Sequence, residues 1–254
     1  MTIHSDSGSP VLTLTLDRPK ANAFDQTQLD ALQQGFEQAE ASPGVAVVIL
    51  RGAGDRAFSA GADMGAVGPL AEPDGLSRWT AQAHAILDRI SAFPVPVIAA
   101  IQRPAVGGGF ELALACHLRV MAGSAHVALP EIQRGYLPSW GALERLVPLS
   151  GPGFALDMLL TGRRVSAEEA LARGVVQRVA DDAEAEARAL ADRIAALPPL
   201  AVRAALSQMA GLGDGSQRVR ERELADLEKL VRTEDTVEGV LAFFEKREPR
   251  FKGR

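Results

Sequence analysis

Two glutamates could carry acid–base chemistry, because one follows a run of glycines and the other an apolar segment. Glu111 follows the consecutive glycines Gly107–Gly109 at the start of an apolar, helix-like run, and Glu131 follows the apolar Ala128-Leu129-Pro130. A carboxyl group in apolar surroundings can have a raised pKa, and two neighbouring carboxyl groups can divide into an acid and a base. Taken singly, Glu111 is more typical of a helix N-terminus and Glu131 of a surface turn. Together with the turns described next, the pair indicates proton transfer beside a stabilised enolate.

Small residues are concentrated in two segments that follow predicted strands, Ala57–Asp63 and Val106–Glu111. Three glycines at the start of a helix are costly unless the backbone approaches another group closely or takes a positive φ. The free N–H groups at a helix N-terminus favour an anion or a developing negative oxygen. Two such turns that converge would provide the two donors of an oxyanion hole, whereas close packing of one loop on another would explain the glycines equally well.

The elements that must hold these turns alternate between strand and helix in the first half of the chain. Val11–Leu16, Val45–Leu50 and Val97–Ile101 are predicted strands. The continuous β-branched run of the second strand indicates burial on both faces. Thr27 is predicted to cap the helix that lies between the first two strands.

A second helix is predicted over Trp79–Ile90, where apolar residues recur at helical spacing. The preceding residues 64–77 contain several glycines and prolines and predict an irregular surface loop. After Ser150 the chain is rich in Ala, Leu, Glu and Arg, which predicts a series of helices. The predicted fold class is therefore α/β, with a helical C-terminal portion.

Composition and charge narrow the class of protein. The 254 residues are 47% hydrophobic and 23% charged, with a net charge of -5, so the chain as a whole has no attraction for nucleic acid or an anionic membrane. A single cysteine cannot form an intramolecular disulfide. The N-terminal MTIHSDSGSP lacks the pattern of a signal peptide, and the longest apolar runs are too short to span a bilayer. We therefore expect a cytoplasmic protein.

Other chemistries find less support in the sequence. Gly52–Ala57 fits a loose dinucleotide-binding pattern, but the helix that such a site requires does not follow it. Cys116 is expected to be a small buried residue rather than a nucleophile. His84 and Asp88 could share a helix face, but two ligands do not make a metal site. We therefore expect no metal.

The sequence closely resembles the crotonase (enoyl-CoA hydratase/isomerase) superfamily. The resemblance follows the chain in order, and its segments are Leu16–Ala23, Phe58–Asp63, Gly107–Ala113, Leu129–Glu131, Thr161–Arg163 and Phe243–Arg247. Each motif is weak alone, whereas the ordered set is highly specific.

This resemblance implies a crotonase-type spiral of ββα units, in which residues 1–195 form the core and residues 196–254 form a helical C-terminal trimerisation region. It implies a homotrimer or a dimer of trimers. The implied substrate is an acyl-CoA thioester, so coenzyme A is carried by the substrate and no separate cofactor is needed. Neither nucleic acid nor a membrane is an expected partner.

By the same resemblance, the backbone N–H groups of Ala62 and Gly108 form the oxyanion hole around the thioester oxygen. Glu111 and Glu131 match the two carboxylates of hydratases: Glu111 activates water at the β-carbon, and Glu131 protonates the α-carbon. The residues expected to contact coenzyme A are Lys20, Ala21, Arg56, Ala60 and Asp63, together with Phe243 and Lys246, which reach the coenzyme A of a neighbouring subunit.

An intact pair of carboxylates favours a hydro-lyase that carries out the reversible syn addition of water to a 2-enoyl-CoA, because an isomerase needs only one base. Double-bond isomerisation and other reactions of the family stay open, since the segments around Glu111 and Glu131 are similar to the carnitinyl-CoA dehydratase branch. A further alternative is a non-catalytic member that binds CoA thioesters. The basic C-terminal tail is more typical of a solvated end or a phosphate contact than of RNA binding.

The chain departs from the family pattern near the site. Leu129 replaces a common glutamine, which makes the surroundings of Glu131 more apolar. Gly65 replaces a common lysine, so a phosphate contact of coenzyme A is expected to be missing. Trp140 stands in a usual glycine-rich run, where it either narrows the acyl pocket or packs in the core.

Overall fold

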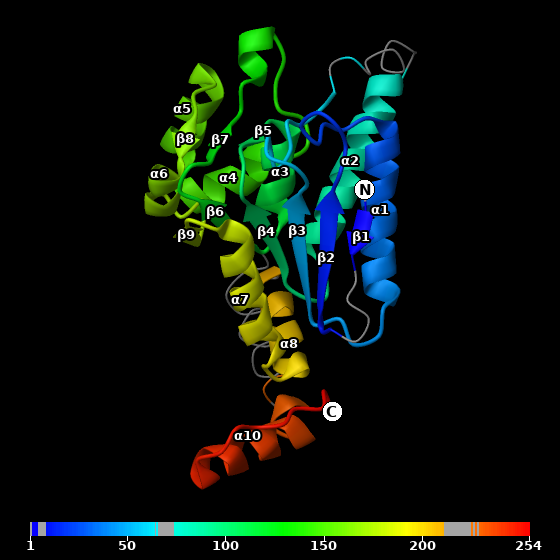
Figure 1. Ribbon diagram of the computed structural model, residues 1–254, viewed down its shortest axis with the longest axis vertical. Helices are drawn as coiled ribbons and strands as arrows, with labels where there is room; N and C mark the ends of the chain where they lie inside the picture. Colours follow the sequence, from blue (N-terminus) through cyan, green and yellow to red (C-terminus); the bar gives the residue numbers. More distant parts are fainter. Residues whose placement is uncertain are drawn as a thin grey trace.

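A mostly parallel sheet forms the body of the molecule (Figure 1) in a computed structural model that describes residues 2–4, 9–63, 65, 74–210, 225, 227 and 229–254. Its strands lie in the order β1-β2-β3-β4-β6-β9; β1 is antiparallel to β2, and each later pair is parallel. Their bounds are Thr2–His4 (β1), Val11–Leu16 (β2), Val47–Gly52 (β3), Val97–Ile101 (β4), Leu118–Ala122 (β6) and Arg178–Ala180 (β9). The predicted α/β class is confirmed.

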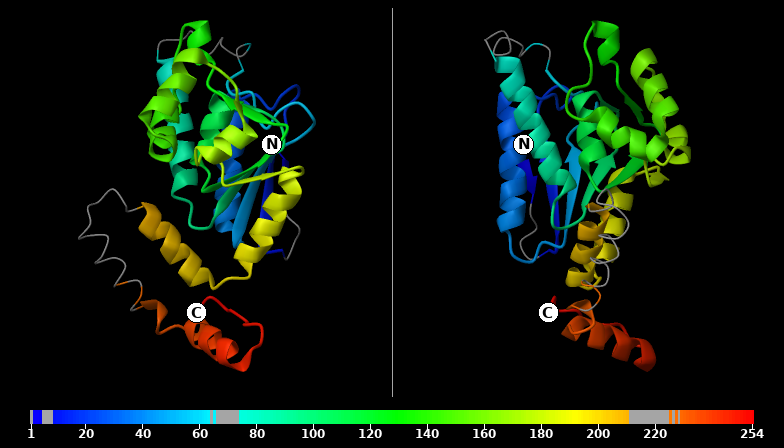
Figure 2. Two further views of the ribbon diagram at one scale, coloured as in Figure 1. Left: turned by 90° about the vertical axis from the view of Figure 1, so that its left-hand side faces the viewer. Right: turned by 180° about the vertical axis from the view of Figure 1, so that it is seen from behind.

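Helices cover both faces of this sheet because its central strands are buried on both sides. Every residue of β4 is buried, as are Val47–Leu50 of β3, which begins two residues later than predicted. The helices α1 (Gln26–Ala41) and α2 (Gly75–Ser91) pack together on one side, and α7 (Ala183–Ala195) lies along the other (Figure 2, left). The expectation of a strand covered on both faces is therefore correct.

The structure corrects two predicted helix starts. Thr27 does not cap α1: the cap is Asp25, whose Oδ1 accepts the Gln28 N–H at 2.9 Å, because an aspartate two residues earlier caps at least as well as threonine. The helix α2 begins at Gly75, inside the segment predicted to be an irregular loop. Residues 64 and 66–73 of that segment lie outside the described residues.

A second, smaller sheet carries the turns that matter for chemistry. Its strand β5 (Ala105–Val106) pairs parallel with β7 (His126–Ala128), and β7 pairs antiparallel with β8 (Val165–Ser166). The helix α3 (Gly108–Ala115) directly follows β5, and the 3₁₀ helix η3 (Glu131–Arg134) follows β7. Because parallel strands have their carboxyl ends at the same edge, the starts of α3 and η3 are brought together.

The second half of the chain is helical, as predicted, except for the short strands β8 and β9. Its described helices are α4 (Ala142–Ser150), α5 (Pro152–Thr161), α6 (Ala167–Ala172), α7, α8 (Pro199–Ala210) and α10 (Glu234–Glu245). Whereas α4 to α6 pack beside the small sheet, α8 and α10 extend away from the body (Figures 1 and 2). The predicted domain division at residue 195 falls at the end of α7 and stays a prediction.

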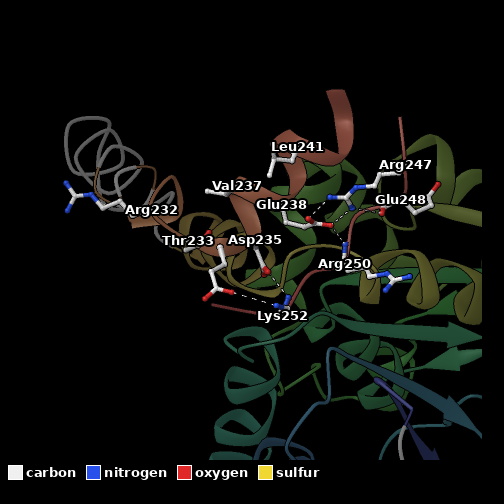
Figure 3. A pocket seen from close by; sticks show the side chains of 11 residues that line it. Arg232, Thr233, Asp235, Val237, Glu238, Leu241, Arg247, Glu248, Arg250 and Lys252 are labelled. Carbon is white, nitrogen blue, oxygen red and sulfur yellow. Dashed lines mark hydrogen bonds and ion pairs between the residues drawn. The ribbon is translucent and has the colours of Figure 1, made fainter. Parts of the chain in front are cut away.

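The end of the chain folds back along α10. Arg247 donates to both carboxylate oxygens of Glu238, at 2.6 and 2.8 Å, and the Lys252 N–H donates to Asp235, so that tail and helix border a shallow hollow (Figure 3). Despite these contacts α10 keeps a row of exposed apolar side chains, namely Val237, Val240, Leu241, Phe243 and Phe244. Among the described helices, none has the length and apolarity to cross a membrane.

Candidate active site

The two glycine-containing turns converge in the structure. Residues 57–62 run parallel to the segment 104–106: the Phe58 N–H donates to Pro104 O, and the Val106 N–H donates to Ser59 O, both at 3.0 Å. This pairing brings the end of the first turn against the start of α3.

Glycine is required where the turns meet because no side chain fits between them. A β-carbon on Gly109 would lie 2.3 Å from Ser59 O, and one on Gly61 would lie 2.7 Å from the Gly108 nitrogen. Gly61 also has a φ of +79°, which other residues rarely adopt. The glycines therefore allow the two turns to pack closely, and the same close packing brings the backbone N–H groups of both turns together.

At this junction, two backbone N–H groups have no acceptor among the described residues. The Gly107 N–H donates to Ala128 O, the Glu111 N–H donates to Gly107 O, and the Asp63 N–H donates to Phe24 O. Among the hydrogen bonds of the described residues, none uses the N–H of Ala62 or Gly108. Because the Gly108 N–H also lies in the first turn of α3, it favours a negatively charged oxygen.

Asn22 holds the first turn in place through hydrogen bonds. Its side-chain amide donates to Ala53 O and Ala57 O, both at 2.9 Å, and its backbone carbonyl oxygen accepts the Ser59 hydroxyl at 2.7 Å. Asn22 is in the left-handed region, with a φ of +54°. The turn that carries Ala62 is thus held by side-chain hydrogen bonds that span more than 30 residues of sequence.

Glu111 is buried, with 2% of its surface exposed, and its carboxylate is held by a distant loop. Oε1 accepts the N–H groups of Trp140, at 2.7 Å, and Ala142, at 3.0 Å. Burial raises the pKa of Glu111 to about 7, against the lowering effect of these donors, and the nearby Glu131 adds to the rise. A carboxyl group with this pKa can both accept and release a proton near neutral pH.

Glu131 is also buried, at 6% exposure, but one of its oxygens has no partner. Among the described residues, no hydrogen bond reaches its Oε2. Burial raises the pKa of this carboxyl group. Its Oε1 lies close to Gly107, where a β-carbon would be 2.6 Å away, so the second carboxylate faces the start of α3. The interpretation of Glu131 as a surface turn residue is wrong.

The loop that holds Glu111 is itself fixed by Arg145. The guanidinium donates to Trp140 O at 2.9 Å and forms an ion pair with Asp88 on α2. Gly141, between the two N–H donors, has a φ of +95°. This bracing fixes the Trp140 and Ala142 N–H groups toward Glu111.

The indole of Trp140 packs inside the molecule beside the site. It is 1% exposed, its ring lies edge-on to Phe24 and Trp79, and its ring carbons lie over Gly108. The residue therefore belongs to the core and also borders the oxyanion turn.

The residues expected to contact coenzyme A fall into two groups. Lys20, Arg56 and Ala60 are exposed and Ala21 is half-buried around the first turn, where the Ala60 N–H donates to Ala21 O. Asp63 is engaged within the protein: Arg18 donates to it at 2.6 Å and lowers its pKa. Phe243 lies in the last turn of α10 and Lys246 directly after it, and within one chain α10 lies away from α3 (Figure 1).

Arg119 is a structural residue that supports α3 and that the sequence analysis did not single out. It is buried in β6, and its guanidinium reaches the C-terminal end of α3, where it donates to Cys116 O at 2.6 Å and Ala113 O at 3.2 Å. Its donors satisfy the carbonyls that a helix end leaves free, while burial lowers its pKa to about 10. The signal was an arginine inside the apolar strand sequence of β6.

The other sequence candidates are structural as well. Cys116 is buried directly after α3, and burial raises its thiol pKa to about 12, which is unsuited to a nucleophile. The described part of the chain contains no group of three or more side chains suited to a metal ion.

The chain matches known proteins along its whole length. The sequence model of the family described as enoyl-CoA hydratase/isomerase matches residues 6–254. A carnitinyl-CoA dehydratase of Salmonella enteritidis is 40% identical over 261 residues, covering 100% of this chain and 99% of that protein.

Solved structures agree with these sequence matches. An enoyl-CoA hydratase from Bacillus anthracis is similar with a TM-score of 0.93 and 35% identity, covering 100% of both chains. An enoyl-CoA hydratase/carnithine racemase from Magnetospirillum magneticum has a TM-score of 0.89 and 38% identity, covering 96% of this chain and 93% of that one. The fold predicted from the sequence is therefore confirmed.

Proposed function

The chain belongs to the enoyl-CoA hydratase/isomerase family, and we propose that it catalyses the reversible addition of water to a 2-enoyl-CoA. The observation that carries the proposal is the meeting of two buried carboxylates, Glu111 and Glu131, with the unpaired N–H groups of Ala62 and Gly108. Water addition requires a base at the β-carbon, an acid at the α-carbon and donors for a developing negative oxygen, and these groups supply all three.

The two N–H groups bind the thioester oxygen in this proposal. When water attacks the β-carbon, the electron pair of the double bond moves toward the carbonyl, and the oxygen becomes an enolate oxygen. The N–H groups of Ala62 and Gly108 then donate to a full negative charge, which strengthens both hydrogen bonds in the transition state. Loss of one such donor typically costs about 10²–10³ in rate.

The two carboxyl groups move the protons. Ionised Glu111 accepts a proton from the attacking water, while protonated Glu131 gives its proton to the α-carbon, so one carboxyl group gains the proton that the other loses. Burial raises the pKa of both groups, so that one of the two can hold a proton near neutral pH while the other is ionised. The Oε2 of Glu131, which has no hydrogen-bond partner among the described residues, supports its role as the group that donates a proton to the substrate.

The test is the loss of the conjugated-enoyl absorbance with crotonyl-CoA. We expect Glu111→Gln and Glu131→Gln each to lower kcat by about 10²–10⁴, the usual contribution of general acid–base catalysis. Glu168→Gln, a change at an exposed residue on α6, is the matched control and should retain the wild-type rate. Turnover that neither active-site change affects would overturn the mechanism.

Dehydration of carnitinyl-CoA is a second candidate, favoured by the 40% identity to carnitinyl-CoA dehydratases. It is the reverse reaction of the same site, with the two carboxyl groups exchanging roles. The assay is a rise of the conjugated-enoyl absorbance after carnitinyl-CoA is added. A kcat/KM for carnitinyl-CoA above that for 3-hydroxybutyryl-CoA would assign the chain to this reaction, and the opposite order would exclude it as the preferred one.

We also propose that the chain assembles through α10 into a trimer or a dimer of trimers. The exposed row on α10 supports this, because soluble monomers rarely expose so many neighbouring large apolar side chains. Assembly would also offer Phe243 and Lys246 to the coenzyme A of a neighbouring subunit.

A further inference from the structure

Trp140 occupies the space over the α-carbon of Gly108. A β-carbon on Gly108 would lie 2.7 Å from Cζ3 and 2.8 Å from Cε3 of the indole, so the ring is in van der Waals contact with the first residue of α3. The side chain is among the largest that are fully buried. Removing the indole would therefore open a cavity next to a proposed oxyanion donor.

Two further aromatic rings hold the indole in place. The Phe24 ring lies 5.5 Å away and the Trp79 ring 5.0 Å away between centroids, both edge-on. These contacts come from the segment before α1 and from α2, and Gly108 adds a contact from α3, so three separate parts of the chain fix one ring. A buried ring with these contacts cannot rotate aside for a ligand without exposing the apolar rings that it covers.

The same residue is joined to the proposed base. The Trp140 N–H donates to Glu111 Oε1 at 2.7 Å, so the indole is attached to the backbone that holds this carboxylate. If the proposed function holds, the thioester oxygen lies at Gly108 and the β-carbon lies at Glu111. The acyl carbons beyond the β-carbon would then extend past Gly108 and Glu111, the two residues that Trp140 contacts.

We propose that Trp140 is the specificity-determining wall of the acyl subsite and limits the substrate to a short, compact 2-enoyl-CoA. The inference rests on the proposed function for the position of the thioester. The wall is apolar, because the rings of Trp140, Phe24 and Trp79 pack against one another. These side chains fill the space beside Gly108. Longer acyl chains would need the volume that the indole fills.

The test compares crotonyl-CoA with 2-octenoyl-CoA in the full-length protein. Burial of each added methylene is worth about fourfold in kcat/KM. We expect wild type to prefer crotonyl-CoA, and Trp140→Ala to raise the octenoyl-to-crotonyl ratio of kcat/KM at least tenfold. Trp140→Phe, which keeps a ring, should change the ratio far less.

Phe36→Ala is the matched control because it also opens a cavity in the core, where Phe36 packs edge-on against Phe93 rather than against Trp140 or Gly108. Its octenoyl-to-crotonyl ratio should stay at the wild-type value. If Trp140→Ala fails to fold, Trp140→Leu removes less volume and should shift the ratio in the same direction. An unchanged ratio in a folded Trp140 variant, or a wild type that accepts both chains equally, would overturn the proposal.

A readout that does not need turnover separates this inference from the proposed function. Calorimetry gives the Kd of butyryl-CoA and octanoyl-CoA for wild type and Trp140→Ala. If no enoyl-CoA is hydrated but the variant gains at least tenfold in relative affinity for octanoyl-CoA, the proposed reaction fails and the wall stands. If crotonyl-CoA is hydrated and the relative affinities do not change, the reaction stands and the wall fails.

Discussion

The indole of Trp140 lies directly against the α-carbon of Gly108, 32 positions away in the sequence (140 minus 108), at a distance that leaves no room for a β-carbon. Gly108 has an ordinary helical backbone rather than a positive φ, so its need for glycine comes from this contact alone. The ring, the donor N–H and the Glu111 carboxylate thus form one packed unit.

This contact predicts that Gly108→Ala destabilises the protein through overpacking. The new β-carbon would meet a buried ring that cannot move freely, so we expect a loss of about 1–3 kcal/mol in the free energy of unfolding. In a Trp140→Ala background the same change should cost less, by about 1 kcal/mol or more, which denaturant unfolding of the double-mutant cycle measures. Gly153→Ala is the control, since nothing lies within 4 Å of its β-carbon position.

The raised pKa of Glu111 predicts a pH dependence of activity. Glu111 must be ionised to accept a proton from water, so kcat/KM for crotonyl-CoA hydration should rise as the pH increases through about 7. In Glu111→Gln the residual rate should lack this rise. A wild-type profile that is flat between pH 6 and 8 would contradict the assignment of Glu111 as the base.

The same pKa predicts that Glu111 lowers stability at neutral and higher pH. The folded protein binds the Glu111 proton up to a pH of about 7, whereas the unfolded chain releases it near 4.5, so stability falls as pH rises between these values. The difference corresponds to about 3 kcal/mol. Relative to wild type, Glu111→Gln should therefore gain stability by about this amount between pH 4 and pH 8, measured by urea unfolding. A constant difference would contradict the prediction.

Substitutions at Asn22 are expected to distinguish the contribution of its hydrogen bonds to stability from the cost of backbone strain. Asn22→Ala removes the bonds to Ala53 O and Ala57 O and places alanine at a φ of +54°, so a loss of about 3 kcal/mol is expected. Asn22→Gly loses the same bonds without the strain and should be about 1 kcal/mol more stable than the alanine variant. Both should lower kcat, because the Ala62 turn loses its anchor. Equal stability of the two variants would assign no strain to this position.

The exposed row on α10 predicts that assembly depends on it. Phe244 is 76% exposed, and Phe244→Asp would place a charge in an apolar contact between subunits. We expect the molar mass from light scattering to fall from an oligomer to 26.8 kDa. The exposed Glu245→Gln is the control on the same helix and should keep the oligomer. A wild-type protein that is already monomeric would overturn the proposed assembly.

Local pattern in the sequence determined the parts of this protein that depend on neighbouring residues. Val11–Leu16 and Val97–Ile101 form strands with the predicted bounds. Their apolar and β-branched residues favour a buried strand whatever the arrangement of the rest of the chain. The glycines at 61 and 107–109 identified both turns, since only glycine fits the close contacts of the backbone there. The cap of α1 was misplaced because Asp25 and Thr27 both suit the role and only the bonded geometry distinguishes them.

Tertiary structure alone decided the environment of the two carboxylates. The sequence could not place the Trp140 and Ala142 N–H groups on Glu111, nor leave Glu131 Oε2 without a partner, because these contacts join segments that are far apart in the chain. Burial and the resulting pKa shifts arise only once the small sheet and α4 close around them. For the same reason the sequence left Trp140 between two interpretations, and the tertiary structure buried its ring in the core against Gly108.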